Sequence, residues 1–148
     1  MNHKCSFSHI VSGQFNKDAI RIAKEVSQNP GKSINPLIIT GYWGSGKTLL
    51  MKAIGNEYNI NFNKDKIGFF YAETFVGDYK KAETENDVIA FRNSHQSHAL
   101  ILIDSIEYIE GIQKAQEEFI QLIDYYIKYQ KQVVCTLASL ANSSSKTY

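Results

Sequence analysis

The octapeptide Gly41–Thr48 constrains this chain more than any other feature of its sequence. It reads Gly-Tyr-Trp-Gly-Ser-Gly-Lys-Thr and matches the phosphate-binding pattern G-x-x-x-x-G-K-[ST] at every fixed position. Glycines at these points let backbone amides curl around a β-phosphate, and the N-terminus of a following helix adds positive potential. The apolar run Leu37–Thr40 precedes the motif, and a helical pattern from Leu49 to Tyr58 follows it. The strand, turn and helix that this motif requires are therefore all predicted.

The motif predicts a site for a nucleotide, ATP or ADP, together with Mg²⁺. Lys47 would place a compact positive charge against the β- and γ-phosphates, and Thr48 would offer its hydroxyl to Mg²⁺. The residues expected to contact the phosphates are Gly41, Gly44, Ser45, Gly46, Lys47, Thr48 and Leu49. The alternative interpretation is a glycine turn with an incidental lysine. Glycine is uncommon enough that the full pattern rarely arises by chance in a chain this long.

Asp104 is the predicted acidic partner of the P-loop. It follows the buried apolar run Leu100–Ile103, and an acidic residue at the end of such a strand can orient magnesium-bound water beside Thr48. Strands also end in aspartate for reasons of turn geometry. The position downstream of a P-loop, with one strand intervening, favours the Walker B interpretation. Lys47 and Asp104 are the catalytic candidates, and Thr48 and Asp104 are the metal-binding candidates.

Alternating strands and helices predict an α/β fold. The expected strands are Leu37–Thr40, Ile67–Ala72, Leu100–Ile103 and Gln132–Leu137. Helices are expected from the N-cap Asn16 to Pro30-Gly31 and over Leu49–Tyr58, Glu73–Ala82, Glu85–Asn93 and Gln113–Lys131. This order predicts a three-layer P-loop NTPase sandwich with a mostly parallel sheet. The length of 148 residues fits one domain. We place that domain at residues 1–137 and a Ser/Asn-rich, disordered tail at 138–148.

Composition excludes several classes of function. A net charge of +1 argues against a molecule that binds nucleic acid through its overall charge. The sequence has no apolar run of membrane-spanning length and no apolar signal segment, so we expect a cytoplasmic protein without a membrane partner. Cys5 and Cys135 are expected to be unpaired thiols. His95 and His98 have metal-like spacing but no acidic or cysteine neighbour, so they are predicted to form a solvated surface pair.

From Phe7 to about Thr136 the chain resembles the AAA+ core of the bacterial replication initiator DnaA. The matching blocks, in chain order, are Ile10-Val11-Ser12-Gly13 with Asn16, Asn29-Pro30-Gly31-Lys32, Asn35-Pro36-Leu37, the P-loop, Met51-Lys52-Ala53-Ile54-Gly55-Asn56, Tyr71-Ala72-Glu73-Thr74-Phe75-Val76, Leu102-Ile103-Asp104-Ser105-Ile106-Glu107, Ala115-Gln116-Glu117-Glu118-Phe119 and Lys131-Gln132-Val133-Val134. The resemblance implies ATP binding, with the adenine near Ile10, Val11 and Asn16. The family's initiators form ATP-dependent filaments on origin DNA, which makes full-length DnaA or another AAA+ subunit the implied partner.

The resemblance also implies a contact with single-stranded DNA. The family's motif for it corresponds here to Val76, Ile112 and Lys114. The family has a lysine where Ile112 stands and an arginine where Lys114 stands, so half of the basic pair is lost. Contacts with backbone phosphates weaken when cations are lost. Single-stranded DNA binding through this surface is therefore expected to be weak.

Several departures from the family predict poor ATP hydrolysis. Ser105 stands where the family has a second acidic residue, and Glu107 is expected to lie on the opposite side of the chain. Ala138 falls where a polar sensor residue is expected. The chain ends before the family's fifth strand, trans-acting arginine finger, helical lid and origin-binding domain. An arginine finger contributes roughly 10³–10⁵ in rate in related systems. ATP binding with weak or no hydrolysis is the expected outcome.

Three functional hypotheses remain at this point. The first is a shortened nucleotide-binding protein that acts in or on replication initiation and caps one end of an initiator filament, since it could accept an arginine finger but supply none. The second is a fragment or degenerate remnant of an initiator with no independent role. The third is a small active P-loop ATPase. Without a fifth strand, Leu37–Thr40 would be an apolar sheet edge that the tail, another copy or a partner must cover.

Overall fold

A parallel β-sheet of four strands forms the centre of the protein. The computed structural model describes residues 5–62 and 66–139. The strands β1 (Leu37–Gly41), β2 (Ile67–Tyr71), β3 (Leu100–Asp104) and β4 (Gln132–Ala138) lie in the order β1-β4-β3-β2. All three pairings are parallel. The predicted α/β fold with a mostly parallel sheet is confirmed.

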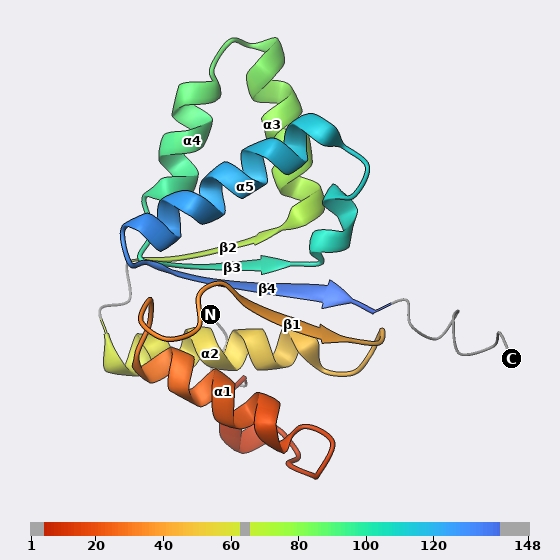
Figure 1. Ribbon diagram of the computed structural model, residues 1–148, viewed down its shortest axis with the longest axis vertical. Helices are drawn as coiled ribbons and strands as arrows, with labels where there is room; N and C mark the ends of the chain where they lie inside the picture. The colour runs from red at the N-terminus through yellow and green to blue at the C-terminus, as the bar shows by residue number, and fades with distance from the viewer. Residues whose placement is uncertain (1–4, 63–65, 140–148) are drawn as a thin grey trace, which may run out of the picture.

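Helices cover both faces of the sheet (Figure 1). On one face lie α1 (Lys17–Gln28) and α2 (Lys47–Asn61), and on the other lie α3 (Ala72–Thr84), α4 (Val88–Gln96) and α5 (Gln113–Lys128). Two short 3₁₀ helices, η1 (Phe7–His9) and η3 (Ile106–Ile109), complete the described elements. None of these helices is long and apolar enough to cross a membrane.

β3 is buried along its whole length because helices pack on both of its faces. Ile101 and Ile103 belong to the core shared with α3, α4 and α5, whereas Leu100 and Leu102 belong to the core shared with α1 and α2. This arrangement explains why the strand reads as a continuous apolar run instead of an alternating one. Asp104 is therefore presented at the end of a rigid, fully buried element.

Amide side chains fasten the segment before β1 to the start of β4. Gln132 is 1% exposed; its Oε1 accepts a hydrogen bond from Gly31 N at 2.7 Å, and its Nε2 donates to Ile34 O at 2.9 Å. Asn35 makes further hydrogen bonds to the backbone on both sides of Gln132. A Cβ on Gly31, whose φ is +75°, would lie 2.0 Å from Gln130 O, so only glycine fits there. These contacts hold β1 beside β4 and so fix where the P-loop begins.

β1 is an edge strand in the described part of the chain. It pairs with β4 alone, and its apolar side chains divide between the two faces. Ile39 is buried against the α1–α2 layer, whereas Ile38, on the opposite face, remains 45% exposed. Half of the backbone hydrogen-bonding groups of such a strand face outward and are open to a neighbouring strand.

The element boundaries differ from the prediction mainly at helix ends. Ala72 begins α3 instead of ending β2, α4 runs three residues beyond its predicted end, and α5 ends at Lys128. Ala138, assigned to the predicted tail, is the last residue of β4, and Ser139 N donates to Gly41 O at 2.9 Å. Residues 140–148, the rest of that predicted tail, lie outside the described residues.

Asn16 occupies the position before α1 as predicted, but its side chain does not cap the helix. Its Oδ1 accepts a hydrogen bond from Gly13 N at 2.9 Å, and its Nδ2 donates to Val11 O at 2.9 Å. The amide therefore closes the loop that precedes the helix. The helix itself is held by the stripe of Ile20, Ala23 and Val26 that packs against α2.

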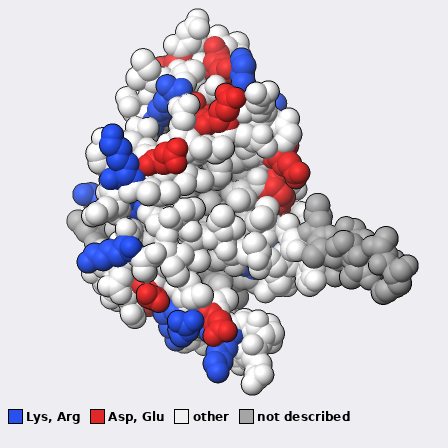
Figure 2. All heavy atoms as spheres, viewed as in Figure 1, with Lys and Arg blue, Asp and Glu red and all other residues white. Residues whose placement is uncertain are grey.

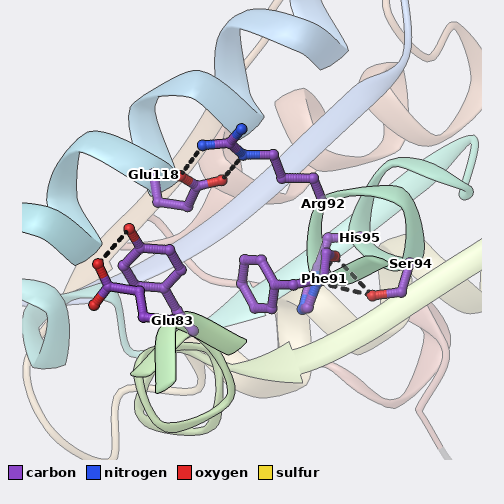
Figure 3. Close-up of polar contacts among 7 residues, drawn as sticks. Glu83, Phe91, Arg92, Ser94, His95 and Glu118 are labelled. Carbon is purple, nitrogen blue, oxygen red and sulfur yellow. Dashed lines mark hydrogen bonds and ion pairs between the residues drawn. The ribbon is translucent and has the colours of Figure 1, made fainter. Parts of the chain in front are cut away.

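An aromatic cluster joins α3, α4 and α5. Phe75 is 1% exposed, and its ring contacts those of Phe70, Phe91, His95 and Phe119. Figure 3 shows Phe91 and His95 side by side on α4, pointing into this layer.

Beside the cluster, a charged pair links α4 to α5. Arg92 donates two hydrogen bonds to Glu118, from Nε at 2.5 Å and from Nη2 at 2.9 Å (Figure 3). The Glu118 side chain is 6% exposed and that of Arg92 is 43% exposed. The two-point geometry raises the pKa of Arg92. The pair fixes the orientation of α4 relative to α5.

The prediction that His95 and His98 form a solvated pair is wrong. His95 lies edge-on to Phe70 and Phe75, and its Nδ1 is hydrogen-bonded to Phe91 O at 2.9 Å. His98 is half-buried, and burial lowers its pKa. Sequence spacing could not show that this side of α4 faces the core. Within residues 5–62 and 66–139, no three His, Cys, Asp or Glu side chains come together as a metal site.

Both cysteines are free thiols, as predicted. Burial raises the pKa of Cys135, on β4, to about 12. A thiol with so high a pKa stays protonated at neutral pH and is a poor nucleophile.

Candidate nucleotide-binding site

The P-loop joins the end of β1 to the start of α2. Gly44 and Gly46 have φ values of +77° and +90°, a region that side chains rarely adopt, and a Cβ at either would meet no atom within 4 Å. Gly41 differs from them, because a Cβ there would lie 2.6 Å from Ser45 Oγ and the serine side chain would have to move. The glycines therefore let the loop curl and leave open space on its concave side.

The loop presents positive groups toward that space. α2 begins at Lys47, and the amides of a helix's first turn have no partner within the helix, so they are free to bind an anion. Lys47 Nζ donates to Tyr42 O at 2.7 Å, which folds the lysine back over the loop. Ser45 N donates to the same carbonyl at 3.1 Å.

Thr48 and Asp104 lie in direct contact although they come from different elements. Thr48 Oγ1 donates to Asp104 Oδ2 at 3.0 Å. Hydroxyl and carboxylate oxygens are ligands suited to Mg²⁺, which protein sites typically hold with few protein groups and with phosphate oxygens. The donor set at this point therefore fits a magnesium ion carried by a nucleotide.

Thr136 is a site residue that sequence reasoning missed. It is 1% exposed on β4, and its hydroxyl donates to Asp104 Oδ1 and accepts a hydrogen bond from Ser105 N at 2.8 Å. Thr136 thereby fixes the orientation of the carboxylate toward Thr48. Its place follows from the strand register, which the sequence does not show: Ile103 pairs with Cys135, so the next residues of β3 and β4 are neighbours.

A cavity of about 360 Å³ lies above these groups at the carboxyl ends of β1, β3 and β4, where ligands bind in parallel sheets. Beside the P-loop glycines, its lining includes Lys47, Thr48, Asp104, Ser105, Glu107 and Ala138. Leu49 and Trp43 also border it, and Trp43 is 69% exposed.

The expectation that Glu107 points away from the site is wrong. Ser105 has a φ of +63°, in the left-handed region, and this turn starts η3. Glu107 is thereby brought to the cavity, where its Oε2 accepts a hydrogen bond from Ala138 N at 3.1 Å. The carboxylate that position 105 lacks is thus supplied to the cavity from position 107.

The residues expected near adenine do not line this cavity. Ile10 packs against the α1–α2 core, Val11 is 81% exposed, and Asn16 holds the loop between Val11 and Gly13. None of the three forms part of the cavity wall around the P-loop. Their role toward a base stays a prediction.

The residues expected to contact single-stranded DNA are poorly placed for it. Val76 is 6% exposed in the core, so its side chain is not available on the surface. Ile112 packs partly against the same core. Lys114 is exposed, but its Nζ lies 3.2 Å from Glu83 Oε1, so its charge is already paired. The face in Figure 2 carries scattered charges of both signs without a continuous basic stripe.

Comparison with known proteins gives consistent sequence matches. The family model of the bacterial DnaA ATPase domain matches residues 1–142. The chromosomal replication initiator protein DnaA of Neisseria gonorrhoeae is 31% identical over 131 residues, which are 88% of this chain and 25% of that protein. The corresponding protein of Neisseria meningitidis serogroup C is 30% identical over the same length. The chain thus spans about a quarter of the length of these curated relatives.

Three solved DnaA structures have a fold similar to that of this chain. Domain III of the Thermotoga maritima replication initiation protein DnaA superposes with a TM-score of 0.88 at 29% identity, covering 93% of this chain and 57% of that one. AMPPCP-bound DnaA from Aquifex aeolicus has a TM-score of 0.86 at 26% identity, covering 96% of this chain and 44% of that one. A replication initiator DnaA bound to AMPPCP and single-stranded DNA has a TM-score of 0.86 at 27% identity, covering 93% and 43%.

Proposed function

The chain belongs to the bacterial DnaA ATPase domain family, and from this premise we propose that it binds ATP or ADP with Mg²⁺ in the cavity above the P-loop. The observation that carries the proposal is the contact between Thr48 Oγ1 and Asp104 Oδ2 at the cavity floor, beside Lys47. Thr48 and Asp104 would hold Mg²⁺, which when bound neutralises phosphate charge. The relatives bound to AMPPCP support an adenine nucleotide as the ligand.

The decisive experiment is a nucleotide titration followed by tryptophan fluorescence. Trp43 is the single tryptophan of the sequence and borders the cavity, so its emission reports on occupancy. We expect saturable changes with ATP and with ADP, weakened by EDTA, and we would repeat the titration with a full-length initiator present. A flat response to both nucleotides, supported by calorimetry, would refute the proposed site.

We propose further that steady-state hydrolysis by this chain is slow, well below the ~1 s⁻¹ of ordinary enzymes. Ser105 and Ala138 border the cavity without the acidic and polar groups expected there. The two arginines of the sequence, Arg21 and Arg92, pair with Asp18 and Glu118 instead of bordering the cavity. Within the described residues, no arginine therefore borders the cavity to stabilise transition-state charge.

The variant Ser105→Asp tests this reading. We expect it to change the steady-state rate by less than about tenfold, because the missing sensor and arginine groups are not restored by a carboxylate at position 105. Phosphate release from wild type and variant gives the comparison. A wild-type rate near ~1 s⁻¹ would instead support a small active ATPase.

We propose that this chain acts in replication initiation by binding another AAA+ subunit of the initiator family. The support is the apolar edge β1, where Ile38 is 45% exposed and only one side is paired in the described residues. Such edges tend to acquire a covering strand. Light scattering of full-length initiator with ATP should change when stoichiometric amounts of this chain are added. Unaltered filament growth would exclude both association and capping.

Binding to single-stranded DNA is proposed to be weak. One relative is bound to single-stranded DNA. Here, however, Lys114 is paired with Glu83, and Val76 is buried. Glu83 already neutralises part of the charge that Lys114 would offer to a phosphate.

A further inference from the structure

We propose that Glu107 is the carboxylate that activates the attacking water in whatever ATP hydrolysis this chain performs. The inference rests on the proposed nucleotide site and assigns one further residue to it. It separates the carboxylate that holds the metal, Asp104, from the carboxylate that accepts the proton of water.

After β3 the chain turns toward the cavity. Asp104 ends the strand, and the left-handed turn at Ser105 (φ +63°) redirects the backbone into η3. Non-glycine residues adopt this conformation at a cost, and such turns cluster at functional sites. The result is that Glu107 borders the same cavity as Lys47 and Thr48.

The two carboxylates at the cavity differ in how many of their oxygens already accept hydrogen bonds. Both oxygens of Asp104 are engaged, Oδ1 by Thr136 and Oδ2 by Thr48. Glu107 accepts one hydrogen bond through Oε2, from Ala138 N. Within the described residues its Oε1 has no hydrogen-bond partner. Of the two carboxylates that border the cavity, Glu107 is therefore the one that keeps an oxygen without a hydrogen bond from the described residues.

Glu107 is also held in place by the backbone of β4. The Ala138 amide, at the end of β4, donates a hydrogen bond to Glu107 Oε2 at 3.1 Å. A positioned base is effective because little reorganisation is needed when the reaction occurs. Anchoring by a backbone amide also keeps the glutamate on the cavity side of η3.

The proposed step is ordinary phosphoryl transfer to water. The oxygen of water forms a bond with the γ-phosphorus as the bond from that phosphorus to the β–γ bridging oxygen breaks. The water proton passes to Glu107 Oε1 and from there to the released phosphate or to solvent. The products are ADP and inorganic phosphate, and no further reactant is needed.

A purely structural role for Glu107, as an acceptor for the β4 backbone, is the competing explanation. The variant Glu107→Gln separates the two roles. The glutamine side-chain carbonyl still accepts the hydrogen bond from Ala138 N, but an amide does not accept a proton from water. Glu110→Gln is the matched control, since Glu110 is an exposed carboxylate three residues along that does not border the cavity.

The experiment is single-turnover hydrolysis of radiolabelled ATP by excess protein with Mg²⁺, with nucleotide affinity measured in parallel by Trp43 fluorescence. We expect a slow wild-type rate that exceeds spontaneous hydrolysis, a rate at least 10-fold lower for Glu107→Gln, and unchanged ATP affinity. Loss of a general base typically costs roughly 10²–10⁴ in rate. Glu110→Gln should match wild type, and Glu107→Asp should keep part of the activity.

Three results would overturn the assignment. They are a Glu107→Gln rate within about twofold of wild type, a wild-type rate equal to spontaneous hydrolysis, and a loss of rate in Glu107→Gln that an equal loss of ATP affinity explains. Failure of wild type to bind ATP is a different result, because it would refute the proposed nucleotide site itself.

Discussion

Replacing Lys47 with alanine is expected to weaken ATP binding by about 100-fold while the fold stays intact. Within the described residues, Lys47 is the only basic side chain that borders the cavity, so no neighbour can replace its charge. A charge-assisted contact contributes ~1.5–3 kcal/mol, and every ~1.4 kcal/mol is tenfold in affinity. Because Lys47 contacts both terminal phosphates in the proposed complex, we expect the upper end of that range. Titration of a fluorescent ATP analogue measures the change.

Lys52→Ala is the matched control for that experiment. Lys52 lies on the same helix, with its Nζ 5.7 Å from the centre of the Phe69 ring, and it does not border the cavity. The Lys52→Ala variant removes one positive charge from α2, as Lys47→Ala does, and should leave ATP affinity near that of wild type. Thermal unfolding should show both variants folded. Equal affinities for Lys47→Ala and wild type would contradict the P-loop interpretation.

The layered fold was predictable because its determinants are local or periodic. β3 had to be buried because its residues Leu100–Ile103 are apolar without alternation, and such a strand is covered on both faces. Gly44 and Gly46 of the P-loop are required by backbone conformation, which a motif records directly. Helix ends were predicted less well, since α3 takes up Ala72 and α5 stops before Lys131. Ends of helices depend on tertiary packing as much as on local sequence.

The details of the site were predictable only where they follow the strand pattern. The contact of Asp104 with Thr48 was predictable because Asp104 ends a buried strand downstream of the P-loop. Glu107 was assigned to the wrong side because sequence does not reveal the left-handed turn at Ser105. Thr136 was missed because its function depends on the pairing of β3 with β4. The places of Glu107 and Thr136 in the site depend on contacts between segments that lie far apart in the sequence. Glu107 contacts Ala138, and Thr136 contacts Asp104.

Phe75→Ala is expected to lower the free energy of unfolding by ~3–5 kcal/mol, the usual cost of removing a buried phenyl ring. Phe75 is 1% exposed, and its ring contacts Phe70 on β2, Phe91 on α4 and Phe119 on α5. No single neighbour can fill the volume, because these rings come from three elements that are fixed independently. The loss is a large part of the ~5–15 kcal/mol that stabilises a typical domain.

Phe69→Ala is the control for that prediction, because Phe69 is a phenyl side chain on β2 that is 36% exposed. Chemical denaturation followed by circular dichroism should give a much smaller loss for it, with similar m-values for both variants. α3, which carries Phe75, also packs against η3, which carries Glu107. We therefore expect Phe75→Ala to slow single-turnover hydrolysis while the P-loop, on the opposite layer, still binds ATP. Equal unfolding midpoints for the two variants would show that the aromatic cluster does not stabilise this layer.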